Sequence, residues 1–334
     1  MIDTAPNAGT RPRLGFLGVG WIGRHRMEAI AKDGAGEIAC VADPVADAAR
    51  DASGAVGCSR VAGSLDELLD AGVDAVVIAT PSALHAEQSI RALERGVAVF
   101  CQKPLGRDAT ETRRVVDAAR AANRLLGVDL SYRHTAAVRA MRERLPELGR
   151  VHAVDLVFHN AYGPDKPWFY DPKLAGGGCV MDLGIHLVDL ALWMLGFPEV
   201  KSVQSQLFHE GRLLASAPEV CEDYAVAQLE LAGGVSVRVA CSWRLPAGRD
   251  CVIEASFYGT KSALSMQNLD GSFYDFQAEM FRGTTREVLA VPPDAWGGRA
   301  AVAWARRLAA DPSYDPAIES VVAVAEALDR IYRR

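Results

Sequence analysis

The first 130 residues alternate between short apolar runs and longer amphipathic stretches. The runs have the length of buried strands, and the stretches between them place apolar residues at helical spacing. The predicted strands are 14–18, 37–42, 74–79, 97–101 and 125–130. The predicted helices are the stretch after Gly23 to about Ala31, then 64–70, 83–95 and 108–122. Regular alternation of strand and helix predicts an α/β fold with a doubly wound parallel sheet.

The pattern changes in the second half, where strands follow one another with few helices between them. The predicted strands are 151–160, 200–209, 224–232, 235–243, 251–258, 263–268 and 273–280. Successive hairpins, one turning at Ala232-Gly-Gly234, predict a large, mostly antiparallel open sheet in a separate α+β domain. The helices predicted at 136–148, 299–310 and 316–332 complete this half. We therefore divide the chain into a disordered tail at 1–11, an α/β domain at 12–130 and an α+β domain at 131–334.

One stretch, Gly176 to Gly196, is apolar nearly all round after three leading glycines. Such a helix belongs in a core, where carboxylates are seldom left without partners. Its polar residues Asp182, His186 and Asp189 stand at i, i+4 and i+7 and share one face. Taken alone, this stripe is compatible with a self-satisfied Asp182–His186 hydrogen bond and Asp189 at a wet edge.

Composition narrows the class of ligand. The chain has 334 residues, a formal net charge of -6 and scattered basic residues, which argues against nucleic acid or a membrane as a partner and favours a small molecule. Its seven cysteines are widely spaced without a C-x-x-C, as expected of reduced residues in a cytoplasmic protein. We expect no signal peptide, no run of membrane-span length and no zinc site, because the histidines are dispersed.

A glycine-rich turn follows the first strand as Gly18-Val-Gly20-Trp21-Ile22-Gly23. Between a strand and a helix, G-x-G-x-x-G lets backbone N–H groups approach a pyrophosphate at the helix N-terminus. Asp43 ends the second strand, twenty positions after Gly23, where a carboxylate accepts hydrogen bonds from the adenosine ribose. Asp43 also repels a 2'-phosphate, so the sequence predicts NAD rather than NADP. The alternative is a turn-forming Asp-Pro without a ligand.

Two further strand ends carry polar residues: Thr80-Pro81-Ser-Ala-Leu-His85 and Gln102-Lys103-Pro104. Ligands of doubly wound sheets bind at the carboxyl ends of the strands. Lys103 follows a buried strand and can polarise a carbonyl or lower the pKa of a hydroxyl there. A solvated lysine is the ordinary alternative.

In succession, these motifs resemble the glucose-fructose oxidoreductase, inositol dehydrogenase and MocA-like family (Gfo/Idh/MocA). The resemblance rests on the glycine turn, Asp43, TPSALH at 80–85, QKP at 102–104, SYR at 131–133 and GGGCVMDLGIHLVDL at 176–190. It implies an NAD(P)-dependent oxidoreductase with an N-terminal Rossmann domain. It also implies subunit contacts through the open C-terminal sheet, so a homodimer or homotetramer is expected.

The resemblance implies that Lys103, Asp182 and His186 form the catalytic set. It places Thr80 and Pro81 along the dinucleotide with His85 nearby, and adds Gln102 and Lys103 to the cofactor-binding residues. The chain departs from the family at Gln102, where Glu is usual. Losing that carboxylate removes a counter-ion for Lys103 and tends to lower the pKa of the lysine.

The resulting hypothesis is reversible hydride transfer between nicotinamide and a secondary alcohol or ketone of a sugar, cyclitol or related polyol. His186 acts as general base, Asp182 holds its ring, and Lys103 steadies the alkoxide. An aromatic loop at 160–170 suits carbohydrate rings, although Trp168 can equally pack into the domain interface. The predicted substrate contacts are Arg133, Tyr162, Lys166 and Trp168.

Two other functions remain open on the sequence alone. Some proteins of the family use transient oxidation by tightly held NAD to assist glycoside cleavage, with no net redox change. A non-enzymatic dinucleotide-sensing protein is the other, suggested by Gln102 and opposed by the intact Lys103, Asp182 and His186.

Overall fold

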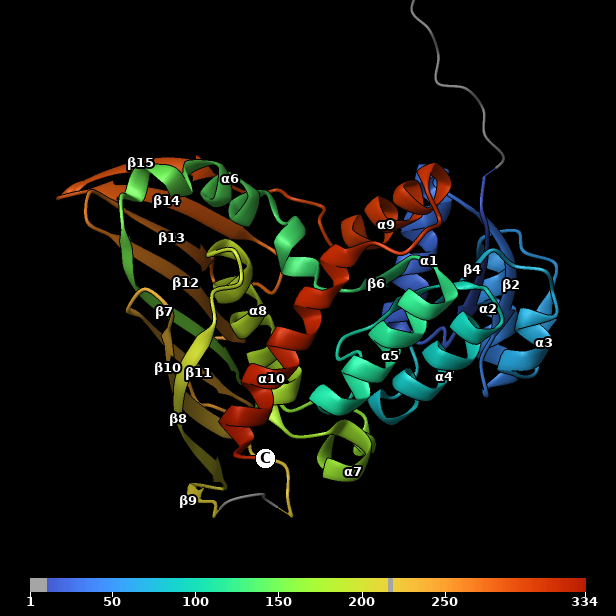
Figure 1. The fold of residues 1–334 in the computed structure, drawn as a ribbon, viewed down its shortest axis with the longest axis horizontal. Helices are drawn as coiled ribbons and strands as arrows, with labels where there is room; N and C mark the ends of the chain where they lie inside the picture. Colours follow the sequence, from blue (N-terminus) through green and yellow to red (C-terminus); the bar gives the residue numbers. More distant parts are fainter. Residues whose placement is uncertain (1–10, 216–218) are drawn as a thin grey trace, which may run out of the picture.

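The computed structural model describes residues 11–215 and 219–334 and contains two sheets that lie side by side (Figure 1). Residues 1–10 of the predicted tail lie outside the described residues. The first sheet has six parallel strands in the order β3-β2-β1-β4-β5-β6. This order reverses beside β1, and the crevice at such a reversal is where doubly wound sheets bind their ligands. The predicted doubly wound sheet is therefore confirmed.

The elements of the first sheet follow the predicted alternation closely. The strands are β1 (Arg13–Leu17), β2 (Glu37–Ala42), β3 (Val61–Ala62), β4 (Ala75–Ile78), β5 (Ala98–Cys101) and β6 (Leu126–Val128). The helices are α1 (Trp21–Asp33), α2 (Ala46–Ala55), α3 (Leu65–Leu69), α4 (Ser82–Glu94) and α5 (Ala109–Ala122). Helix α2 and strand β3 were not predicted, because α2 is mostly alanine and polar residues and β3 has only two residues.

The second domain is built on a nine-stranded sheet in the order β15-β14-β13-β12-β7-β11-β10-β8-β9. Its strands are β7 (Val151–Asn160), β8 (Val200–His209), β9 (Arg212–Leu213), β10 (Tyr224–Leu231), β11 (Val235–Ser242), β12 (Cys251–Gly259), β13 (Ala263–Asn268), β14 (Phe276–Arg282) and β15 (Thr285–Ala290). The β7–β11 pair is parallel, and the other described pairs are antiparallel, which confirms the predicted sheet. Strand β15 was missed because its residues are mostly exposed and lack apolar alternation.

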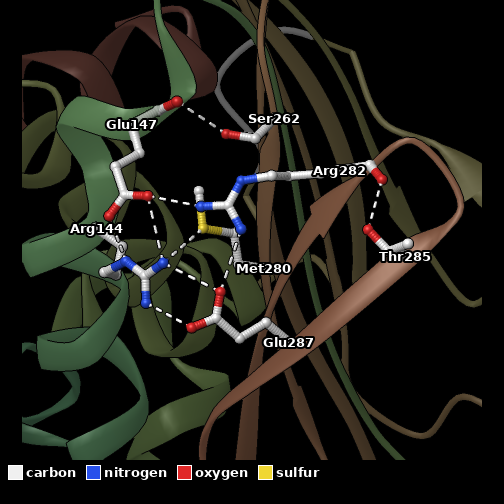
Figure 2. A network of polar contacts seen from close by, with 7 residues as sticks. All are labelled: Arg144, Glu147, Ser262, Met280, Arg282, Thr285 and Glu287. Carbon is white, nitrogen blue, oxygen red and sulfur yellow. Dashed lines mark hydrogen bonds and ion pairs between the residues drawn. The ribbon is translucent and has the colours of Figure 1, made fainter.

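A surface network of charged side chains fastens α6 (Ala136–Arg144) to the last strands of this sheet, as Figure 2 shows. Arg144 pairs with Glu147 and Glu287, and Arg282 reaches Glu147 at 2.7 Å. The Ser262 hydroxyl donates to the Glu147 carbonyl at 3.0 Å. Single exposed pairs contribute little to stability, but a shared network of this kind fixes the position of the sheet edge.

The last part of the chain returns to the first domain, beside α1 (Figure 1). Helix α9 (Arg299–Ala310) packs Trp304 against Phe100, with ring centroids 5.3 Å apart. Gly127 makes room for it, because a Cβ there would lie 2.5 Å from the Trp304 ring. Helix α9 therefore packs on the first domain although it follows the second sheet in the chain. Helix α10 (Ser320–Tyr332) then runs between the two domains.

The glycine-led stretch differs from the regular helix predicted for it. The short helix α7 (Pro172–Ala175) comes first, and Gly176 to Gly178 follow as a non-helical turn. A π-helical turn over Val180–Gly184 then leads into α8 (Ile185–Met194). The stretch Pro172–Met194 is long and apolar enough to cross a membrane, so the expectation of no such run is wrong. In this structure 83% of its apolar window is buried inside the protein, as in the core helix of a folded domain.

Candidate active site

In the glycine turn after β1, a side chain at Gly18 or Gly23 would clash with the backbone, whereas Gly20 faces open space. A Cβ at Gly18, whose φ is 83°, would lie 2.6 Å from the Ala79 carbonyl oxygen. A Cβ at Gly23 would lie 2.1 Å from the Gly18 carbonyl oxygen. A Cβ at Gly20 would meet no described atom within 4 Å, and no described side chain caps α1 there. Open space before uncapped N–H groups fits the pyrophosphate of a dinucleotide.

Asp43 lies beside this turn, at the carboxyl end of β2. Its carboxylate accepts hydrogen bonds from the backbone N–H of Val19 at 2.8 Å and of Val45 at 2.9 Å. The sequence placed Asp43 near the cofactor by spacing alone, and the structure brings it directly against the glycine turn. The two backbone donors hold the carboxylate in place beside the glycine turn.

A cavity of about 510 Å³ extends from the glycine turn into the space between the two domains. Many of the predicted site residues line it together: Gly20, Trp21, Ile22, Thr80, Pro81, His85, Gln102, Lys103, Lys166, Trp168, Asp182 and His186. Within residues 11–215 and 219–334, no group of three or more His, Cys, Asp or Glu side chains is placed to hold a metal ion. The cavity therefore joins the cofactor end predicted in one domain to the catalytic stretch predicted in the other.

Lys103 and Asp182 both line this cavity, and their side chains bind to each other. Its Nζ donates to the Asp182 backbone carbonyl at 2.7 Å and to Oδ1 of the carboxylate at 2.8 Å. The second carboxylate oxygen accepts from the indole N–H of Trp243 at 3.0 Å. Lys103 thus has Asp182 as its carboxylate partner, although position 102 is Gln.

His186 lies one turn beyond Asp182 and is only 8% exposed. Its ring centroid lies 4.8 Å from that of Tyr132, and Nδ1 has no hydrogen-bond partner among the described residues. The pKa of His186 is well below its usual value, because burial and then the charges of Lys103 and Arg26 disfavour the imidazolium. The ring is therefore neutral at neutral pH and able to accept a proton.

The predicted hydrogen bond between Asp182 and His186 is not formed. The prediction assumed a regular helix with i, i+4 neighbours, but Asp182 lies in the π-helical turn. Both of its carboxylate oxygens face Lys103 and Trp243 instead. Within the described part of the chain, Asp182 orients the lysine rather than the imidazole.

Gln102 belongs to a buried network that the sequence did not reveal. Its Nε2 donates to Asp129 Oδ2 at 2.6 Å, and Arg26 Nε donates to the same oxygen at 2.6 Å. Arg26 also reaches the Ser131 hydroxyl at 3.1 Å. Arg26, Gln102 and Asp129 all line the cavity. Asp129 follows β6, so the rule that ligands bind at strand ends could have flagged it.

His85 links the two polar strand ends. It is 1% exposed, and its ring nitrogens lie 2.6 Å from the Pro104 carbonyl and 2.7 Å from the Thr80 carbonyl. Burial lowers the pKa of His85, so a neutral ring donates to one of these carbonyls at a time. The histidine therefore holds the Thr80 and Lys103 segments together at the cavity wall.

Two of the predicted substrate contacts are directed elsewhere. Arg133 pairs with Asp189, which is 2% exposed, and its guanidinium stacks against Trp193 with 5.6 Å to the ring centroid. Tyr162 is exposed and donates to Asp250 outside the cavity lining. Trp168 does line the cavity, where it stacks on Phe169. The cavity lining also includes aromatic residues that the sequence did not single out, Tyr274 and Trp296.

A Rossmann sheet with an open helix N-terminus, joined to a cavity that holds a Lys–Asp pair and a neutral histidine, defines a dinucleotide-binding oxidoreductase of two domains. Residues 13–130 match the family described as "Oxidoreductase family, NAD-binding Rossmann fold". Residues 138–265 match the "GFO/IDH/MocA C-terminal domain". The chain belongs to the Gfo/Idh/MocA family, which confirms the resemblance seen in its motifs.

Two similar proteins carry names of oxidoreductases. The putative UDP-kanosamine synthase oxidoreductase subunit of Amycolatopsis mediterranei (strain S699) is 32% identical over 71% of this chain and 70% of its own. The D-glucoside 3-dehydrogenase of Escherichia coli (strain K12) is 28% identical over 60% of each chain. The latter alignment therefore spans less than two thirds of the relative.

Solved structures share the whole fold. GenD2 from gentamicin A biosynthesis, in complex with NAD, has a TM-score of 0.81 and 26% identity, and the match covers 100% of this chain and 96% of GenD2. KijD10, a 3-ketoreductase from Actinomadura kijaniata in complex with NADP and TDP-benzene, has a TM-score of 0.80. Its identity is 21% over 96% of each chain, which supports the fold alone.

Two glycines of the turn, Gly23 and Gly20, predict distinct outcomes when changed to alanine. Gly23→Ala places its Cβ against the Gly18 carbonyl, so we expect a loss of thermal stability as well as of NADH binding. Gly20→Ala leaves the thermal stability of the free protein unchanged, yet weakens NADH binding by about tenfold or more because it fills the space for the pyrophosphate. Thermal unfolding and NADH fluorescence titration measure both effects. Unchanged NADH affinity in Gly20→Ala would contradict this placement of the cofactor.

Proposed function

We propose that the protein transfers a hydride between the C4 carbon of a bound nicotinamide and a secondary alcohol or ketone of a sugar, cyclitol or related polyol. The observation that supports this most is the meeting of Lys103, Asp182 and His186 in the cavity that begins at the glycine turn. A dinucleotide bound along that turn supplies the carbon that accepts or returns the hydride. The chain itself supplies the groups that handle the substrate oxygen and its proton.

Lys103 orients the substrate oxygen in this proposal. An ammonium group has three donors, and Asp182 accepts two of them through its backbone carbonyl and Oδ1. The third donor is assigned to the substrate oxygen, where a positive charge stabilises the developing alkoxide. Asp182 keeps Lys103 in place, and Trp243 keeps Asp182 in place.

His186 takes the hydroxyl proton during oxidation and returns it during reduction. Its lowered pKa keeps the imidazole neutral, which is the form that accepts a proton. Its surroundings are aromatic, with the Tyr132 ring packed against it.

The sugar class rests on the walls of the cavity and on the relatives. Trp168, Tyr274 and Trp296 line the cavity and offer ring faces on which the C–H groups of a pyranose or cyclitol stack. The relatives named as acting on a glucoside or on a nucleotide-linked sugar support the same class. NAD is proposed over NADP because the Asp43 carboxylate lies where a 2'-phosphate needs a positive charge.

A screen of sugars, amino sugars and inositols tests the function, with NAD and NADP supplied in parallel. We expect NADH to accumulate in proportion to the ketone product, since the proposal is net oxidation.

His186→Ala lowers kcat by roughly a hundred to ten thousand fold and leaves the NADH dissociation constant within about threefold. His152→Ala, at an exposed histidine of β7, is the matched control and keeps its activity. Substrate turnover without NADH accumulation would point to NAD-assisted glycoside cleavage instead.

The pH dependence of kcat/KM for oxidation follows from the protonation state of His186. Neutral His186 is required, and its pKa is lowered by burial and by the charges of Lys103 and Arg26. Activity therefore stays high as the pH falls through about 6.5, the usual histidine value, and declines only at more acidic pH. An acid limb with its midpoint above that value would rule out His186 as the base.

Cofactor preference tests the role of Asp43. We expect kcat/KM for NAD to exceed that for NADP by about tenfold or more. Asp43→Asn keeps the size of the side chain and one of its two acceptor oxygens but removes its charge, so the ratio of kcat/KM for NAD to that for NADP falls. Asp47→Asn, an exposed position on α2, leaves the ratio unchanged. A preference of the parent protein for NADP would contradict the assignment.

A further inference from the structure

Glu222 is a fully buried carboxylate outside the set of residues assigned to the reaction. It lies just before β10 and is 0% exposed. Its Oε2 accepts from the Gly178 N–H at 2.9 Å, and its Oε1 accepts from the Val180 N–H at 2.8 Å. The backbone carbonyl of Glu222 accepts from the Cys179 N–H at 2.9 Å. One residue thus binds three consecutive amides at the start of the catalytic stretch.

Tyr332, at the end of α10, completes this arrangement. The residue is 2% exposed, and its hydroxyl donates to Glu222 Oε1 at 2.8 Å. The same hydroxyl oxygen accepts from the Met181 N–H at 3.0 Å. Glu222 and Tyr332 therefore bind every backbone N–H from residue 178 to residue 181, and the next residue is Asp182.

The leading glycines are shaped for these two residues. A Cβ at Gly178 would lie 2.0 Å from the Glu222 carbonyl oxygen. A Cβ at Gly177 would lie 2.1 Å from the Tyr332 hydroxyl oxygen. Because Gly177 and Gly178 have no side chains, Glu222 and Tyr332 of the same chain lie close to the backbone at the start of this helical stretch.

Glu222 is held by the dipoles of N–H and O–H groups. Among the described residues no Lys or Arg pairs with the Glu222 carboxyl group. Burial raises the pKa of this group. The N–H groups of Gly178 and Val180 and the hydroxyl of Tyr332 oppose that effect. N–H groups at the start of a helix are a favourable site for a carboxylate. Losing one of these bonds leaves a buried polar group unsatisfied, which is costly.

We propose that Glu222 and Tyr332 are positioning residues that set where Asp182 meets Lys103. The four anchored amides fix the backbone directly before Asp182, whose own carbonyl and carboxylate both bind Lys103 Nζ. They also fix the π-helical turn, which begins at Val180 and carries His186 on the helix that follows. This inference rests on the proposed dehydrogenase function, because positioning has meaning only for a reaction at Lys103 and His186.

The test compares Tyr332→Phe and Glu222→Gln with the control Ser205→Ala. Ser205 is also buried, and its hydroxyl donates to the carbonyl of Ile331, the neighbour of Tyr332, at 2.6 Å. We expect kcat on the best sugar of the screen to fall about tenfold or more in both test variants, with KM for NAD within about twofold. Hydrogen exchange of the amides from residue 178 to residue 181 accelerates in both. Ser205→Ala keeps its kcat and its exchange at those amides.

If the Tyr332→Phe variant folds and its kcat stays within about twofold of the parent value, the proposal is overturned. An equal loss of kcat in Ser205→Ala also overturns it, because the effect is then general destabilisation. If Glu222→Gln fails to fold, Tyr332→Phe alone decides the question, since it removes one oxygen only. If the parent oxidises no sugar, the proposed function fails by itself. The hydrogen-exchange comparison then still decides whether the two residues hold the turn.

Discussion

The arrangement of the site depends on one contact, the pair of hydrogen bonds from Lys103 to Asp182. Lys103 follows β5 of the Rossmann sheet and Asp182 belongs to the second domain, so the contact joins the two domains at the cavity that both residues line. The two side chains are 19% and 17% exposed. Removing one partner at such a site leaves a poorly solvated charge, which is much more damaging than losing an exposed ion pair.

Each side of this contact has its own support. In the first domain His85 ties the Thr80 and Pro104 segments together, and the Gln102–Asp129–Arg26 network fixes the strand ends beside Lys103. In the second domain Trp243 holds the free oxygen of the Asp182 carboxylate. Pre-organised groups of this kind stabilise a developing charge without rearranging during the reaction.

The sequence predicted the features that are local in the chain. Apolar alternation predicted the bounds of most strands and helices, and motif spacing correctly predicted that Asp43 and Lys103 lie at strand ends. Long-range pairs such as Arg26–Asp129, 103 positions apart, and the return of Trp304 to Phe100 leave no local pattern. Helical spacing also failed where a π-helical turn changes the register, so Asp182 was paired with His186 instead of Lys103. Motif spacing also did not reveal that Arg133 pairs with Asp189, which is buried.

The direct test of the central claim is a double-mutant cycle between Lys103 and Asp182, read as the single-turnover rate of hydride transfer to NAD from the best sugar substrate. The variants are Lys103→Met, Asp182→Asn and their combination. If the two residues act as one unit, the double variant is no more than about threefold slower than the slower single variant. If the two losses multiply, Lys103 and Asp182 act independently, and the dependence of the site on their contact is contradicted.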